Sequence, residues 1–167
     1  MNILIRTETG ADHDAIEALT VAAFLNAPHT DHNEQRIVRD LRQAGALSLS
    51  LVAELEGRVV GHLCFSPVTI SDGCLHWYGL GPISVSPELQ GKGLGSRLME
   101  VGLAELKGMG AAGCVVLGDP GFYGRFGFVS EPGLTLPGVP AEYFMARSFG
   151  AAMPRGEVCY HPAFVQA

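Results

Sequence analysis

Three glycines at alternate positions form the part of this sequence best suited to chemistry. The run reads Gln90-Gly91-Lys92-Gly93-Leu94-Gly95-Ser96 and joins an apolar, strand-like segment to an amphipathic one. Glycine lets the backbone approach a ligand closely, and the first N–H groups of a following helix point at that ligand with the helix dipole behind them. Lys92 and Arg97 add positive charge nearby. The run therefore predicts a pyrophosphate-binding loop.

This run does not match the motifs of two common phosphate-binding loops. A Walker A loop requires Ser or Thr after its Gly-Lys pair, whereas Gly91-Lys92 is followed by Gly93. A dinucleotide fingerprint requires a third glycine where Ser96 stands, and an acidic residue about 20 residues further on after a second strand. The run is therefore neither a Walker A loop nor a dinucleotide-binding loop.

The sequence of residues 90–95 instead resembles the acetyl-CoA loop of the GNAT N-acetyltransferases, whose motif is Gln/Arg-x-x-Gly-x-Gly/Ala. Gln90, Gly93 and Gly95 occupy its defined positions. Downstream, the run GFYGRFGF at 121–128 resembles the Tyr-x-x-x-Gly-Phe segment of the same family. The two motifs stand in the order that the family shows.

This resemblance covers most of the chain and is strongest from Val52 to Phe128. The ending YHPAF at 160–164 is also similar to a bacterial, YhbS-like subgroup of predicted GNAT acetyltransferases. The resemblance implies an α/β (α+β) GNAT fold, with a mixed, mostly antiparallel central sheet flanked by helices and a splayed strand pair that holds acetyl-CoA. It implies an N-acetyltransferase in which an amine attacks the thioester directly in a ternary complex, with acetyl-CoA as cosubstrate.

The resemblance also implies roles for particular residues. Tyr123 occupies the family position beside the thioester sulfur and is expected to protonate the departing CoA thiolate, as a phenol can. The strand that contains Ile83, Ser84 and Val85 is expected to give main-chain contacts to the pantetheine arm. The expected pyrophosphate ligands are Gln90, Gly91, Lys92, Gly93, Leu94, Gly95 and Ser96.

The general base and the identity of the acceptor stay open on the sequence alone. Glu34, Asp119, His62 and His76 could each relay a proton from an ammonium group through water. Their ordinary interpretations are a solvated helix residue for Glu34, a helix cap for Asp119, and hydrogen-bonded strand residues for the two histidines. The acceptor is an amine on a small molecule or a peptide, and variable loops with the first two helices build its wall in this fold.

Two other functions fit parts of the same pattern. A non-catalytic sensor or regulatory module of this fold would bind acyl-CoA without turning it over, although the presence of Tyr123 favours an enzyme. A domain that binds another phosphate ligand, such as a nucleotide, would need only the glycine loop. Competition by CoA but not by ATP or NAD would separate this last hypothesis from the other two.

The composition indicates a globular chain with its own core. With 167 residues, 47% of them hydrophobic and 17% charged, we expect one domain over residues 1–167 that buries about 70% of its unfolded surface. A homodimer through the C-terminal strands is compatible with the sequence. We expect reduced thiols and no metal, because the four cysteines lie far apart without zinc-ligand spacing: Cys64, Cys74, Cys114 and Cys159.

Charge and hydropathy exclude several classes of partner. The formal net charge is −6 and the eleven Lys and Arg residues form no dense cluster, which argues against nucleic acid and anionic membranes and is compatible with a cationic amine. The N-terminus has no apolar run of signal-peptide length. The longest uncharged stretches, 59–71 and 73–87, are shorter than the roughly 18 residues of a membrane span. We therefore expect a cytoplasmic protein.

Hydrophobic periodicity predicts the elements that position these residues. The expected order is β-α-α-β-β-β-α-β-α-β, as in a mixed sheet flanked by helices. Gly79, Gly81 and Pro82 interrupt the expected strand 74–85 and predict a bulge or an unpaired edge. The other expected elements are strands at 2–8, 48–54, 59–70, 113–117, from 127, 143–149 and 157–160, helices over 16–24, from Asp31, over 93–107 and over 122–126, and an irregular loop at 131–140.

Overall fold

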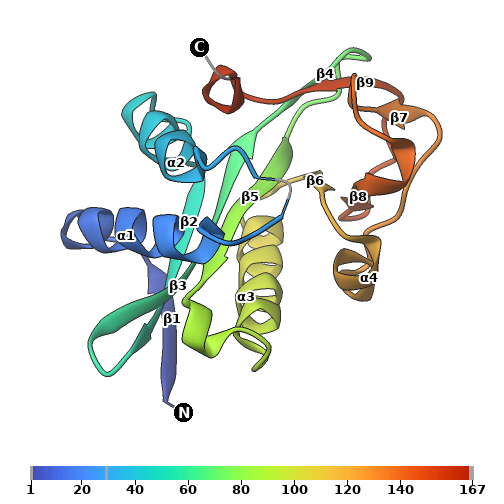
Figure 1. The fold of residues 1–167 in the computed structure, drawn as a ribbon. Helices are drawn as coiled ribbons and strands as arrows, with labels where there is room; N and C mark the ends of the chain where they lie inside the picture. The colour runs from blue at the N-terminus through green and yellow to red at the C-terminus, as the bar shows by residue number, and fades with distance from the viewer. Residues whose placement is uncertain (1, 29, 166–167) are drawn as a thin grey trace.

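The structure of the protein, a computed structural model, describes residues 2–28 and 30–165, and a six-stranded sheet forms its centre (Figure 1). Adjacent strands are antiparallel except for β5 and β6, which run parallel. This confirms the predicted mixed, mostly antiparallel sheet. In spatial order the strands are β1 (Ile3–Thr7), β2 (Leu49–Leu55), β3 (Arg58–Pro67), β5 (Trp77–Val85), β6 (Gly113–Leu117) and β8 (Phe144–Ser148).

Helices cover both faces of this sheet. α1 (His13–Phe24) and α2 (Glu34–Gln43) lie on one face, and α3 (Leu94–Gly108) lies on the other (Figure 1). The helical spacing of apolar residues in the sequence predicted all three. The protein is therefore a layered α/β structure in which the strands are enclosed between helices.

Alternating side chains along β3 divide the core into two layers. Leu63 and Phe65 pack with residues of α3, whereas Cys64 between them packs with Ile16 of α1. Gly102 of α3 allows the close approach, because a Cβ there would lie 2.7 Å from Leu63 Cδ2 and 3.1 Å from Phe65 Cε2. A larger residue at this position would push the helix away from the sheet.

The hairpin predicted over 48–70 forms, but its second strand ends early. Glu56 and Gly57 join β2 to β3 with φ angles of 51° and 78°, as a two-residue hairpin turn requires. β3 stops at Pro67, which has no N–H to donate, and the strand predicted to reach residue 70 is wrong at that end. Residues 69–70 instead form β4 (Thr69–Ile70), which belongs to a separate three-stranded sheet. In this sheet β9 (Gly156–Cys159) pairs with β4 and with β7 (Leu134–Thr135).

Two histidines with positive φ lie where a helix and a strand begin later than the sequence predicted. His32 has a φ of 57° and turns the chain, so α2 begins after Asn33 and not after the predicted cap Asp31. His76 has a φ of 66°, and the strand predicted from residue 74 begins at Trp77. The expectation of a half-buried strand position for His76 is wrong, because the residue lies exposed in the preceding loop.

The aromatic segment also differs in its boundaries. α4 (Pro120–Tyr123) begins directly after Asp119, earlier than the helix predicted from residue 122, and a 3-10 turn, η3 (Gly124–Phe126), follows it. Pro at the first helical position and a capping Asp before it favour this early start. The strand predicted from residue 127 is wrong: Val129 makes only an isolated bridge with Ala146.

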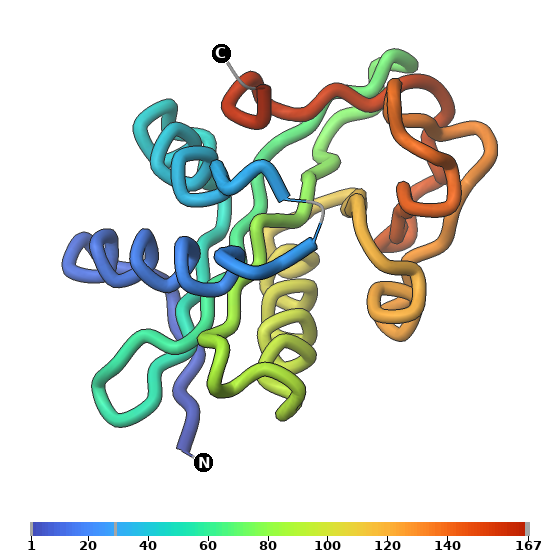
Figure 2. The backbone as a smooth tube through the Cα atoms, viewed as in Figure 1, coloured from blue at the N-terminus to red at the C-terminus, as the bar shows by residue number. Residues whose placement is uncertain are grey.

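The end of the chain returns to the N-terminal helices. The 3-10 turn η5 (Pro162–Phe164) packs on α2, where Ala163 is buried with Ile37 and Leu41. Figure 2 shows this C-terminal segment running from β9 back toward α2. Within residues 2–28 and 30–165, none of the helices is both long and apolar enough to cross a membrane.

Candidate functional site

β5 and β6 separate partway along their length. Parallel pairing joins residues 77–79 of β5 to residues 113–115 of β6, and β5 then continues to Val85 beyond this register. β5 carries a β-bulge at this point: Leu80 pairs with Phe65 of β3 and Ile83 pairs with Leu63, so three residue steps on β5 correspond to two on β3. A bulge bends the strand that contains it, and β5 therefore turns away from β6. The interruption predicted from Gly79, Gly81 and Pro82 therefore forms, and it opens a gap between the two strands.

The glycine loop lies at the end of β5, where α3 begins. Gly91 and Gly93 have φ angles of 77° and 85°, and a Cβ at either position would meet no atom within 4 Å. The first helical hydrogen bond comes from the Arg97 N–H to the Gly93 carbonyl at 3.1 Å, so the N–H groups of 94–96 are not used by the helix. These open backbone donors fit the predicted pyrophosphate loop.

Contacts along the loop tie it to β5. Gln90 Nε2 donates to the Val85 carbonyl at 3.0 Å. A Cβ on Gly95 would lie 3.9 Å from Val85 Cγ2 and 3.8 Å from Phe122 Cζ. The structure thus brings the loop, the end of β5 and the aromatic segment together, although no residue of 90–96 lines the cavity described below.

The sequence indicated Lys92 and Arg97 as the positive charges beside the loop, and the structure adds Arg125 while directing Arg97 elsewhere. Arg97 donates to the Ile3 carbonyl at 3.3 Å and is directed toward β1. Arg125 instead donates to Ser96 Oγ at 3.3 Å, in the first turn of α3. Its guanidinium carbon lies 5.0 Å from the ring centroid of Phe122. The cation within the aromatic motif was the signal that could have identified Arg125.

Tyr123, the last residue of α4, packs its ring against Gly118, which directly follows β6. A Cβ on Gly118 would lie 2.5 Å from Tyr123 Cε2, so the ring packs directly on that glycine. The ring of Phe122 meets it edge to face at 5.0 Å between centroids. Burial raises the pKa of Tyr123 to about 12, and the nearby Cys114 and Asp119 act in the same direction. The phenol is therefore protonated at neutral pH and can donate.

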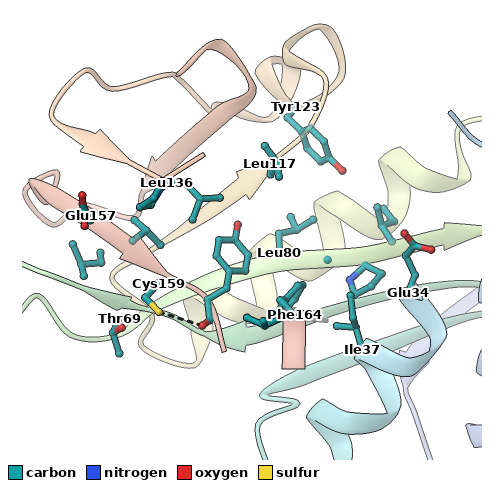
Figure 3. Close-up of a pocket in the computed structure, with 18 of the residues that line it drawn as sticks. Glu34, Ile37, Thr69, Leu80, Leu117, Tyr123, Leu136, Glu157, Cys159 and Phe164 are labelled. Atoms are coloured by element: carbon teal, nitrogen blue, oxygen red, sulfur yellow. Dashed lines mark hydrogen bonds between the residues drawn. The ribbon is translucent and has the colours of Figure 1, made fainter. Parts of the chain in front are cut away.

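A cavity of about 990 Å³ lies where β5 leaves β6, and Ile83 and Tyr123 both line it. Figure 3 shows Tyr123 and Leu117 across this space from Leu80, with Glu34 and Glu157 at opposite ends. Its walls come from α1, α2 and α4, from β4, β5, β6 and β9, and from the segment before β8 and the C-terminal segment. The lining residues are Phe24, Glu34, Ile37, 69–71, 80–83, Leu117, Tyr123, 136–137, 157–160, Phe164 and Val165.

Of the four candidate bases, Glu34 alone lines this cavity. His62 is fully buried and hydrogen-bonded to Ser50 Oγ at 2.8 Å, and burial lowers its pKa to about 4. Asp119 Oδ1 accepts from the Gly121 N–H at 3.0 Å and caps α4, which is the structural role that the sequence indicated. His76 lies in an exposed loop.

Potential metal ligands do not gather in the part of the chain that the structure describes: it contains no group of three or more His, Cys, Asp or Glu residues that could hold an ion. The four cysteines are unbonded to one another. The polar side chains that line the cavity include the carboxylates of Glu34 and Glu157 and the phenols of Tyr123 and Tyr160.

The fold and the site together define a class of protein, an α/β protein whose central sheet opens around a cavity beside a glycine loop. The model of the acetyltransferase (GNAT) family matches residues 13–128 of this chain. The chain therefore belongs to the GNAT family of acetyltransferases. This confirms the family that the two sequence motifs indicated.

Solved structures of similar proteins agree with this assignment over nearly the whole chain. A GNAT family acetyltransferase from Brucella melitensis, in complex with acetyl-CoA, is 47% identical with a TM-score of 0.88, over 98% of this chain and 99% of that one. YhbS from Escherichia coli, in complex with CoA, is 35% identical with a TM-score of 0.86, over 98% and 92%. By sequence, the uncharacterized N-acetyltransferase YhbS of Escherichia coli K12 is 41% identical over 127 residues, which are 75% of this chain and 73% of the relative. The predicted GNAT fold and the YhbS-like resemblance are confirmed.

Proposed function

We propose that this N-acetyltransferase moves the acetyl group of acetyl-CoA directly to an amine while both are bound in the cavity between β5 and β6. The observation that carries the proposal is that Ile83, from the freed edge of β5, and the Tyr123 phenol line one cavity. The similar Brucella melitensis protein, 47% identical, is known in complex with acetyl-CoA, which supports acetyl-CoA as the cosubstrate here. The carrier of the acetyl group and its acceptor would then meet at one point.

Different segments of this chain would bind different parts of acetyl-CoA. The loop Gln90–Ser96 would hold the pyrophosphate through its backbone donors, and no side chain obstructs Gly91 or Gly93. The backbone of Ile83–Val85 would bind the pantetheine arm, because this edge of β5 extends past its pairing with β6. Ser84 is only 2% exposed, so Ile83 and Val85, which are half-buried, are the more accessible residues of this edge.

Transfer then needs one proton donor. The amine nitrogen forms a bond with the thioester carbon, the carbon–sulfur bond breaks, and Tyr123 gives its proton to the sulfur. The proton lost by the amine leaves through water, and Tyr123 regains a proton from solvent. Correct placement of two bound reactants supplies about 7–11 kcal/mol of the barrier reduction, so modest acid help is sufficient.

The residues that line the cavity extend along the sequence from Phe24 to Val165. We therefore propose that residues 1–167 act as one catalytic domain. Neither the first helices nor the C-terminal segment could be removed without opening a wall of the site.

Calorimetric titration of the purified protein with acetyl-CoA, with CoA, ATP and NAD in parallel, tests the proposed function. We expect selective binding of acetyl-CoA and CoA, followed by release of thiol when an amine acceptor is added. Binding without thiol release over a broad amine panel would support the sensor alternative. Folded protein, free of copurified CoA, that binds only ATP or NAD, or nothing, would overturn the proposal.

A further inference from the structure

The charges around the cavity are all of one sign. Among the residues that the structure describes, Glu34 and Glu157 are the charged side chains that line it, and none of the lining residues is Lys or Arg. Figure 3 places these carboxylates at opposite ends, with Leu80 and Phe164 between them. An acceptor that carried a carboxylate or phosphate into this space would therefore find no cation to pair with it.

Glu34 is the carboxylate suited to bind the reacting end of the acceptor. Its Oε2 accepts a hydrogen bond from Thr30 Oγ1, whereas its Oε1 is buried without a hydrogen-bond partner among the described residues. A buried carboxylate oxygen without a donor is costly, and an ammonium group supplies both the donor and the opposite charge. Glu157, in contrast, is exposed to solvent at the other end.

The space between these ends is lined mainly by apolar groups, although the Tyr160 hydroxyl, which is buried without a hydrogen-bond partner among the described residues, is also part of the lining. Ile37, Leu80 and Phe164 contribute aliphatic and aromatic surface. The ring of Tyr160 meets Phe164 edge to face at 5.0 Å between centroids, and it packs against Gly79, where a Cβ would lie 2.8 Å from its Cε2. A wall of this kind favours a hydrocarbon body and disfavours a hydroxyl-rich or highly charged one.

We propose that the acceptor is a primary amine carried on an apolar body without an anionic group, and that Glu34 binds its ammonium, which loses one proton through water before the neutral amine attacks the thioester. This inference rests on the proposed function and specifies its acceptor. An α-amino acid or an amine that bears a phosphate is excluded by the missing cation. A polycationic amine gains little, because the second carboxylate faces solvent.

Three six-carbon amines of equal length test the proposal: hexylamine, 1,6-diaminohexane and 6-aminohexanoate. They share the reacting amine and differ only in the charge at the far end. With thiol release as the readout, we expect kcat/KM for hexylamine to exceed that for 6-aminohexanoate by about tenfold or more, since an unpaired anion would be buried. The diamine should be no better than hexylamine. A preference for 6-aminohexanoate, or a tenfold preference for the diamine, would overturn the proposal.

Glu34→Gln separates the carboxylate from the rest of the wall. We expect KM for hexylamine to rise about tenfold, with a smaller change in kcat and unchanged acetyl-CoA binding, since a charge-assisted contact is lost. Glu17→Gln is the matched control, because Glu17 also lies on an N-terminal helix and pairs with Arg39 at the surface. An unchanged KM in Glu34→Gln would contradict the assigned role.

The calorimetric titration distinguishes failure of this inference from failure of the proposed function. If acetyl-CoA binds selectively but hexylamine and 2-phenylethylamine are not acetylated, the acceptor inference is wrong while the cosubstrate stands. If acetyl-CoA does not bind to the folded protein, both are wrong.

Discussion

Gly118 illustrates how one residue positions another in this site. Because a Cβ at 118 would lie 2.5 Å from Tyr123 Cε2, the phenol ring can occupy its place only against a glycine. The Tyr-x-x-x-Gly-Phe pattern identified Tyr123, but it gave no indication of the surface on which the ring packs.

Tyr123→Phe tests the proton donor. We expect turnover to fall about 100-fold to 10,000-fold while acetyl-CoA affinity stays within about twofold, because the ring is kept and only the proton donor is lost. The measurements are steady-state thiol release and calorimetry. Tyr143→Phe is the control, since Tyr143 is 46% exposed and does not line the cavity. A rate equal to that of the unsubstituted protein would remove the acid role.

Arg125→Gln tests the cation beside the first turn of α3. We expect acetyl-CoA affinity to fall about fivefold at low salt and the difference to shrink at high salt, because exposed charges are screened. Turnover at saturating acetyl-CoA should be unchanged. Arg97→Gln is the matched control, because Arg97 lies on the same helix but donates to Ile3. Equal losses in the two variants would show that the position of Arg125 is unimportant.

Among the elements, the turn that begins α3 illustrates how backbone conformation leaves N–H groups without helical partners. Gly93 has a φ of 85°, which an L side chain rarely adopts, and the N–H groups that follow it are left without helical partners. The glycine spacing predicted this element correctly, because the requirement for positive φ is local to the chain.

Gly93→Glu should abolish measurable acetyl-CoA binding while the protein stays folded. The new side chain would place both bulk and negative charge where the pyrophosphate is proposed to bind. Gly110→Glu is the matched control: Gly110 follows the other end of α3, has a φ of 91° and likewise has open space around it. Calorimetry gives the affinities and circular dichroism the folded state. Micromolar binding retained by Gly93→Glu would refute the loop assignment.

At the scale of the whole molecule, a buried polar network joins the first strand, the helices and the sheet. Arg42 donates twice to Glu8 at 3.0 Å, and Glu8 also accepts from Ser50, which contacts His62. Burial opposes ionisation of Glu8, but hydrogen bonds from Arg42 and Ser50 hold its pKa below its usual range. Hydrogen bonds from Arg6 likewise hold the pKa of Asp12 well below its usual range.

These pKa shifts predict loss of stability in acid. His62 has a pKa of about 4 when folded and an ordinary value of 6.5, so the unfolded chain binds more protons between those values. The free energy of unfolding should therefore fall by about 3 kcal/mol as the pH drops from 7 to 4. The folded pKa values of Glu8 and Asp12 are depressed below their ordinary values of 4.5 and 3.8, so their contributions should be lost progressively as the pH falls below about 4.5.

Denaturant unfolding at a series of pH values checks this prediction. His62→Gln should show a shallower pH dependence between 4 and 6.5, whereas the exposed control His32→Gln should keep the original slope. A free energy of unfolding independent of pH over that interval would contradict the assignment to a buried, neutral histidine. The homodimer and the cytoplasmic location remain predictions at this scale.

The amino-acid sequence by itself determined the features that depend on neighbouring residues. The glycine loop, the interruption of β5 and the helices α1, α2 and α3 all follow from local backbone demands or from apolar spacing. The sequence also indicated the family, because the motif of Gln90, Gly93 and Gly95 precedes the Tyr123 motif in the order that the family shows. These features need no contact between distant parts of the chain.

Only the tertiary structure decided which distant residues share the site. The sequence indicated Arg97 as a cation beside the loop, but packing directs Arg97 to β1 and brings Arg125 to Ser96 instead. Glu34 and His62 were alternative bases until the fold placed Glu34 at the cavity and buried His62 on β3. The physical reason is that a side chain's direction and solvation depend on elements far along the chain, and local periodicity carries no information about them.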